Sequence, residues 1–137
     1  MSGFEFIEHT ADIGVLASGD TLADVFAQAA LGMVSFMSGL ESIQEREVRE
    51  VEVSAPDRET LLVAWLNELV YLFGVEGLLF RRFEVLEVDD THLRARCHGE
   101  RLDRTRHRVT AEVKSATYHM LEVKKNDSWH ARVILDI

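Results

Sequence analysis

The sequence predicts an α+β domain in which two amphipathic helices pack on a mainly antiparallel or mixed β-sheet. Two segments of the first half carry apolar residues at the three-and-four spacing of a helix, whereas the second half is rich in β-forming residues. Strands therefore follow one another after the second helix, instead of alternating with helices as in a doubly wound fold. A chain of 137 residues is the size of a single domain, which we expect to span residues 1–137.

The first fifty residues predict two short strands, a helix and a third strand. Residues 4–8 and 13–17 contain β-formers in partial alternation, so each is expected to form a strand. From Thr21 the apolar residues adopt helical spacing as far as Met37, and Thr21 with Asp24 forms a possible capping box. A helix is therefore expected to begin after Thr21 and to end near Met37.

A strand over residues 48–55 is followed by the second helix, for which Asp57 is the natural N-cap. One face of this helix is apolar. Its members are Leu61, Leu62, Trp65, Leu66, Leu69, Leu72 and Phe73. A Trp and Leu stripe at this spacing is typical of a helix face buried in a core.

The remainder predicts strands over residues 80–88, 93–98, 109–113, 118–124 and 129–135. Asp-Asp at residues 89–90 and Asn-Asp at residues 126–127 indicate hairpin turns. Residues 99–108 are polar and rich in arginine, which favours either a mobile lid or docking loop or a solvated hairpin tip.

Composition narrows the class of function. Fifteen Lys and Arg against 24 Asp and Glu give a formal charge of −9, which argues against broad, charge-driven nucleic-acid binding, although a local basic patch is compatible with it. No apolar run approaches the roughly 20 residues that span a bilayer, and no secretion signal opens the chain. The single cysteine, Cys97, reads as a small apolar strand residue, so we expect a cytoplasmic protein without disulfides or a thiolate metal site.

Nucleophilic and phosphate-loop chemistry find little support, because the sequence has neither a Gly-x-Ser-x-Gly elbow nor a glycine-rich nucleotide loop. Its six histidines lack the i, i+4 pairing of a helical zinc site. Oxygen ligands remain: Asp12, the Asp136 side chain and the terminal carboxylate of Ile137 suit calcium, magnesium or manganese. They converge if the two ends fold against each other; alternatively Asp12 caps a turn and Asp136 is solvated.

Two further residues near these carboxylates are candidates for a role. Lys114 is an isolated cation among apolar and small residues, so it can balance the carboxylates or meet a phosphate, or it is an ordinary exposed strand lysine. We expect His9 to orient the Asp12 loop through a hydrogen bond and leave it out of the metal set.

Six ordered blocks of the sequence together resemble the archease family nearly from end to end. The blocks are His-Thr-Ala-Asp-Ile-Gly at residues 9–14, Gly-Asp-Thr-Leu at 19–22 with Phe26, the helix over 62–71, Gly-Glu at 99–100, Val-Lys-Ser-Ala-Thr-Tyr-His at 113–119 and Ile-Leu-Asp-Ile at 134–137. The resemblance implies an archease-like fold and a non-catalytic activator of the RtcB-type tRNA-splicing RNA ligase. Such an activator promotes guanylylation and multiple turnover of the ligase and broadens its nucleotide use.

Carried over residue by residue, the resemblance implies a metal site at Asp12, Asp136 and Ile137 and an activating lysine at Lys114. The implied cofactor is a divalent metal ion, and the implied partner is the ligase, without direct sequence-specific nucleic-acid binding and without a membrane. Two alternatives stay open. One is a stand-alone divalent-metal-dependent hydrolase using the same carboxylates, and the other is a chaperone-like module for nucleic-acid enzymes that acts through apolar surface.

Overall fold

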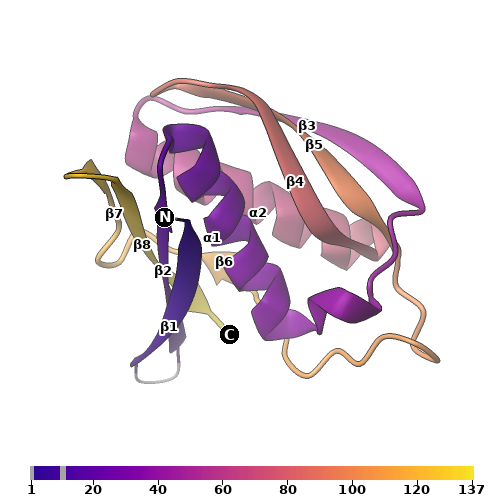
Figure 1. The fold of residues 1–137 in the computed structure, drawn as a ribbon. Coiled ribbons are helices and arrows are strands. Elements are labelled where there is room, and N and C mark those ends of the chain that lie inside the picture. Colours follow the sequence, from indigo (N-terminus) through magenta and orange to yellow (C-terminus); the bar gives the residue numbers. More distant parts are fainter. Residues whose placement is uncertain (1, 10–11) are drawn as a thin grey trace.

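The computed structural model describes residues 2–9 and 12–137, whose strands and helices are shown in Figure 1. In chain order they are β1 (Gly3–His9), β2 (Asp12–Gly19), α1 (Leu22–Met37), the 3-10 turn η1 (Leu40–Ser42), β3 (Glu47–Ser54), α2 (Arg58–Glu76), β4 (Leu78–Val88), β5 (His92–Arg101), β6 (Ser115–Ala116), β7 (Glu122–Lys125) and β8 (Trp129–Asp136). The α+β class predicted from the sequence is confirmed.

The described strands form two antiparallel sheets where the sequence suggested one. The larger sheet has the order β1-β2-β8-β6, with β7 also paired to β8, and the smaller one has the order β3-β5-β4. Figure 1 shows the first sheet on one side of α1 and the second on the other. The larger sheet pairs the first strands of the chain with its last strand, so the two ends are folded together.

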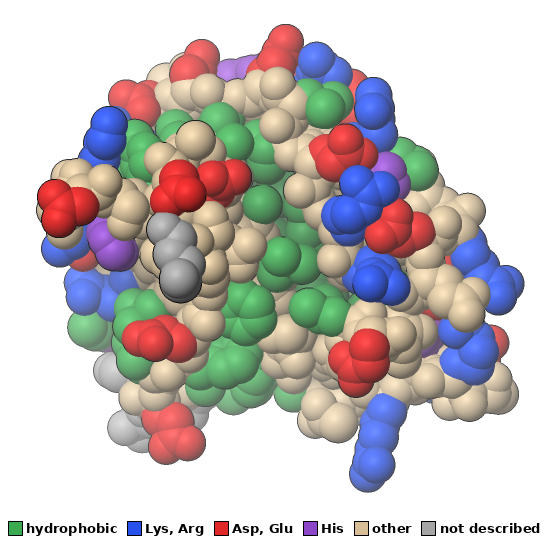
Figure 2. Space-filling model, viewed as in Figure 1, with side chains coloured by type: hydrophobic (Ala, Val, Ile, Leu, Met, Phe, Trp, Pro, Cys, Tyr) green, Lys and Arg blue, Asp and Glu red, His purple; other side chains and the backbone are tan. Residues whose placement is uncertain are grey.

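Helix α1 lies between the two sheets and packs against β2 and β4. It begins as predicted: Thr21 Oγ1 accepts a hydrogen bond from the Asp24 amide at 3.0 Å, and Asp24 accepts one in return from the Thr21 amide. Figure 2 shows an apolar strip between the sheets, on the side where α1 lies. Apolar residues thus extend across α1 from one sheet to the other.

Helix α2 also buries one face in the core. Asp57 caps it by accepting a hydrogen bond from the Thr60 amide at 2.8 Å, as the sequence predicted. Trp65 is fully buried, and its indole N–H donates to the main-chain carbonyl of Phe26 in α1 at 3.0 Å. The predicted core role of the Trp and Leu stripe is therefore confirmed. Neither helix in the described ranges combines the length and the apolar character needed to cross a membrane.

The connection between β5 and β7 differs from the prediction. Residues 109–113 form no strand and make a single bridge, between Val109 and Ser38, while the Thr110 amide donates to the Met37 carbonyl. The strand predicted over residues 118–124 is reduced to β7, and the two-residue strand β6 was not predicted. The hydrophobic pattern was misleading here because Val113 is buried by packing rather than by sheet pairing.

Candidate metal-binding site

The register between β2 and β8 brings two predicted metal ligands together. Asp12 begins β2, Asp136 ends β8, and the two residues are directly opposite each other across the antiparallel pair. Directly opposed side chains point to the same face of a sheet, with Cβ atoms about 5 Å apart. Both residues are half-buried. The predicted convergence of the two ends of the chain thus places these carboxylates side by side on the backbone.

The pair lies on the face of the sheet that points away from α1. Val15 is fully buried and faces Gly32 of α1, so the alternation along β2 turns Asp12 and Gly14 to the other face. A Cβ atom on Gly14 would lie 2.3 Å from Ile7, which shows how closely the strands' side chains pack there. The carboxylates therefore stand at one end of an outer sheet surface.

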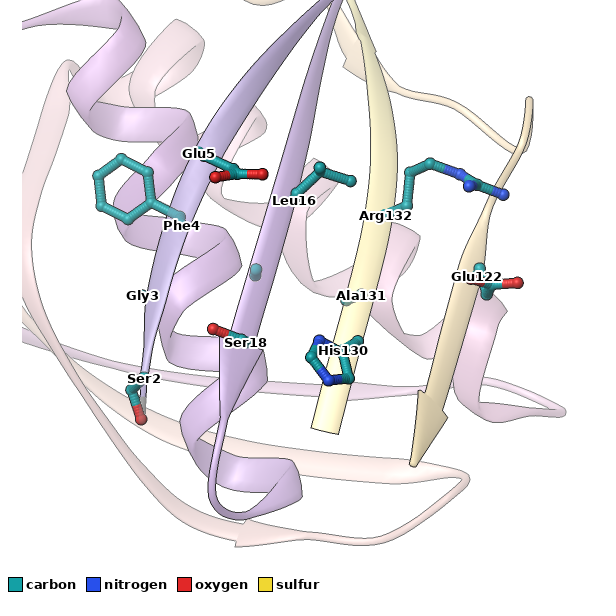
Figure 3. Close-up of a pocket in the computed structure, with 11 residues that line it drawn as sticks. Ser2, Gly3, Phe4, Glu5, Leu16, Ser18, Glu122, His130, Ala131 and Arg132 are labelled. Carbon is teal, nitrogen blue, oxygen red and sulfur yellow. The ribbon is translucent and has the colours of Figure 1, made fainter. Parts of the chain in front are cut away.

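Figure 3 shows the rest of this outer surface, with the helices behind the strands. Glu5, Leu16, Arg132 and Glu122 form a row across β1, β2, β8 and β7 and line a hollow of about 450 Å³. The hollow is mixed in polarity and lies further along the strands than the carboxylate pair. The pair belongs to the rim of the sheet rather than to an enclosed pocket.

Lys114, which directly precedes β6, lies at the same corner. The Lys114 amide donates to the main-chain carbonyl of Asp136 at 2.8 Å, and Ser115 is the Cα partner of Asp136. The Lys114 side chain is exposed. The described residues Asp12, Asp136 and Lys114 are therefore neighbours in the sheet, although more than a hundred positions separate Asp12 from the other two in the sequence.

The side chain of Asn67 in α2 contacts the main chain of β6. The Asn67 side chain accepts a hydrogen bond from the Ala116 amide at 2.7 Å and donates to the Ala116 carbonyl at 3.4 Å. The amide group thus replaces a neighbouring strand at the free edge of β6. In the sequence, the only sign of this role is that Asn67 is a polar residue among the buried Trp65, Leu66 and Leu69.

The donor chemistry at this corner fits a hard divalent cation. Asp12 and Asp136 present carboxylate oxygens from adjacent strands, and carboxylate oxygens are the ligands that calcium, magnesium and manganese prefer. Within residues 2–9 and 12–137 no three His, Cys, Asp or Glu side chains are grouped as a metal would require. The third donor of the predicted set is the main-chain carboxylate of Ile137, which follows β8. Residues 10 and 11 and the His9 side chain lie outside the described atoms.

A second polar cluster, away from the carboxylate pair, anchors the arginine-rich segment. Glu100 is 3% exposed and accepts hydrogen bonds from the Gln44 amide at 2.6 Å, from His107 at 2.9 Å and from Arg106. Burial alone would raise the pKa of the Glu100 carboxyl, but the hydrogen bonds from Arg106, Gln44 and His107 lower that pKa to about 2. Glu100 and His107 therefore anchor the segment to the protein, while its arginine side chains at 101, 104, 106 and 108 are exposed, in keeping with the expected solvated tip.

Cys97 behaves as the sequence predicted. It is fully buried in β5, and burial raises the pKa of its thiol to about 12. A thiol in that state is neutral at physiological pH and inaccessible, so it cannot act as a nucleophile or as a metal ligand.

Comparison with known proteins agrees with this architecture. Residues 4–137 match the family model of the Archease protein family (MTH1598/TM1083). Protein archease of Pyrococcus abyssi is 38% identical over 143 residues, with both chains fully covered. The fold thus belongs to the archease class of small α+β proteins. The chain is a member of the archease family.

Two solved structures have the same fold. The solution structure of Methanobacterium thermoautotrophicum protein 1598 is 39% identical and superposes with a TM-score of 0.84, covering 98% of this chain and 99% of the other. A crystal structure from Thermotoga maritima, described as an archease and possible chaperone, is 22% identical with a TM-score of 0.63, covering 96% and 94%. At that lower identity the second likeness concerns the fold alone.

Proposed function

We propose that this chain is a non-catalytic activator of the RtcB-type tRNA-splicing RNA ligase and acts through a divalent-metal site at Asp12, Asp136 and Ile137. The observation that carries the proposal is the register of β2 and β8, which sets Asp12 opposite Asp136 in a chain of the archease family. The activator promotes guanylylation and multiple turnover of the ligase and broadens its nucleotide use. It functions in the cytoplasm, without a membrane.

The residues of the corner have separate tasks in this proposal. Asp12 and Asp136 present carboxylate oxygens from neighbouring strands, so their spacing is set by sheet pairing and not by flexible loops. A calcium, magnesium or manganese ion bound there supplies positive charge for the phosphate chemistry of the ligase. Lys114, held beside Asp136 through its own amide, directs an exposed ammonium group toward the partner or balances the carboxylates.

A ligase assay with matched variants tests the proposal. We expect Asp12→Asn and Lys114→Ala to remove most of the stimulation of ligase guanylylation. The control variant Asp127→Asn makes the same chemical change in the exposed β7–β8 turn, and it should stimulate guanylylation as wild type does. Full stimulation by Asp12→Asn would refute the metal-site assignment. Stimulation that survives both substitutions would favour the chaperone-like alternative, and phosphoester hydrolysis by the isolated protein with manganese or magnesium would favour the hydrolase.

Metal binding has its own readout, independent of the ligase. A ligand that binds only the folded protein stabilises it by RT ln(1 + [L]/Kd), which is about 2.7 kcal/mol at a hundredfold excess over Kd. We expect calcium or manganese to raise the Tm of the wild-type protein and of Asp127→Asn, and to leave the Tm of Asp136→Asn unchanged. Equal shifts in all three proteins would show that the ion binds elsewhere.

A further inference from the structure

Two neighbouring hollows lie on the surface formed by the connection after β5. The first, of about 510 Å³, lies between the start of β3, the end of β5 and residues 102–106. The second, of about 370 Å³, lies between the C-terminal half of α2 and residues 112–113. Leu102 and Arg104 line both hollows, so the two hollows lie next to each other. We call the two adjacent hollows together the arginine groove; none of the residues of the proposed metal site lines it.

One end of the arginine groove is cationic in a chain whose net charge is −9. Arg46, Arg101, Arg104 and Arg106 line it together with Glu47, Glu100 and Asp103. Each of the three acids has a partner within the protein. Glu100 accepts hydrogen bonds from Arg106 and His107, Asp103 accepts one from Thr105, and Glu47 forms an ion pair with Arg101 at 3.4 Å.

Two of the four guanidinium groups retain free donors. The Arg46 side chain is 64% exposed, donates to the neutral amide oxygen of Gln44 and lies 3.6 Å from Glu100. Arg104 is exposed and forms no ion pair with any part of the chain that the structure describes. Guanidinium groups with free N–H donors match the geometry of phosphate oxygens.

The cationic end is held in place before any ligand arrives. The buried Glu100 accepts hydrogen bonds from Arg106 and His107, and the Asp103 amide donates to Nδ1 of His107 at 2.8 Å. The Leu102 amide donates to the Gly77 carbonyl at 2.6 Å, which joins the segment to the end of α2. A site that is ordered in advance loses less conformational entropy on binding.

The other end of the arginine groove is apolar and open. Val70, Phe73 and Val113 supply its hydrophobic wall beside the exposed Glu112, and Gly74 and Gly77 at the adjoining helix end add no side chains of their own. A Cβ atom at Gly74 would meet nothing within 4 Å, so a flat group can approach the helix backbone there. Arg104 stands where the two ends meet.

We propose that the arginine groove binds a nucleotide unit, with its phosphate on Arg46 and Arg104 and its base against Val70 and Phe73. A cationic end beside an apolar end fits a ligand that joins phosphate to an aromatic ring, and the combined space has the size of a small-molecule site. The unit is a free mononucleotide or the end of an RNA strand. This binding is additional to the proposed metal-dependent activation.

Titration of the full-length protein with four probes tests the inference: inorganic phosphate, GMP, GTP and a ten-nucleotide single-stranded RNA, each followed by calorimetry at low and physiological salt. We expect the nucleotides or the RNA to bind more tightly than phosphate. The double variant Arg46→Ala/Arg104→Ala should weaken binding at least tenfold. Gly74→Leu, which fills the apolar end without changing charge, should weaken the nucleotides and RNA but not phosphate.

Arg96→Ala removes an exposed arginine of β5 that does not line the arginine groove, and it should bind as wild type does. Tighter binding of RNA than of GMP and GTP would identify an RNA end as the ligand, and the reverse order a free nucleotide. The inference is overturned by any one of three results: no probe binds, phosphate binds as tightly as the nucleotides and RNA, or Arg96→Ala weakens binding as much as the double variant.

Discussion

Replacing Glu100 by Gln should change how the stability of the protein depends on pH. The carboxyl is 3% exposed and its pKa is lowered to about 2 from an ordinary value of 4.5. Because the folded pKa lies below the unfolded one, the ionised group stabilises the fold above the unfolded value. That contribution is lost as the pH falls toward the folded pKa. Acidification should therefore unfold the wild-type protein more readily than its net charge alone suggests.

The expected size follows from the two pKa values. Linkage gives a loss of about 2 kcal/mol between neutral pH and pH 3, rising to about 3 kcal/mol at pH 2. The Glu100→Gln variant has no carboxyl at this position, so its free energy of unfolding does not contain this pH-dependent loss. At pH 7 the variant should be less stable than wild type, because the buried N–H of His107 no longer has a charged acceptor. The two stability curves should therefore approach each other as the pH falls.

Urea unfolding followed by the fluorescence of Trp65 and Trp129 measures the free energy of unfolding at each pH from 7 to 3. Other carboxylates titrate in the same range, so the informative quantity is the difference between wild type and Glu100→Gln. Glu5→Gln, at an exposed position of β1, serves as the control and should run parallel to wild type. Curves for Glu100→Gln that also stay parallel to wild type would refute the linkage argument.

Substitutions at three further positions test packing and edge pairing. Gly99→Ala would put a Cβ atom 1.9 Å from the Leu79 carbonyl, so β4 and β5 must separate, and we expect a loss of more than about 3 kcal/mol in urea unfolding. Gly74→Ala, which meets nothing within 4 Å, should stabilise α2 by up to about 1 kcal/mol; equal effects at the two glycines would contradict this. Asn67→Leu should cost about 1–3 kcal/mol and speed hydrogen exchange at the Ala116 amide. Asn67→Asp keeps the acceptor and should protect that amide better, so identical exchange in the two variants would argue against the Asn67 contact.

The helices could be predicted because their signals are local. The capping pair Thr21 and Asp24 and the N-cap Asp57 act within one helical turn, and the apolar spacing between the caps needs no tertiary information. The limits of the hairpin strands β4 and β5 were also close to those expected. The division into two sheets was not predictable in this way, since it depends on which strands pair across α1.

The candidate site was partly within reach of the sequence for a similar reason. Asp12 and Asp136 stand at strand ends, so a single correct pairing of β2 with β8 was enough to make them neighbours. Asn67 and Glu100 were different: their partners, Ala116 and Gln44, lie 49 and 56 positions away. Their roles depend on tertiary contacts of irregular or very short segments, which hydrophobic periodicity does not describe.

The connection from β5 to β6 contains little regular structure, yet it carries both Arg104 and Lys114. Its order comes from separate anchors: the buried Glu100 near its start, the Thr110 amide on the end of α1, and the Asp136 carbonyl at Lys114. Because the anchor at Lys114 is its main-chain amide, the ammonium group takes no part in holding the segment. The Lys114 side chain is thus available for charge, whereas its position is set by the backbone and by the pairing of β6 with β8. Loss of activation in Lys114→Ala would for this reason report on the charge and not on the fold.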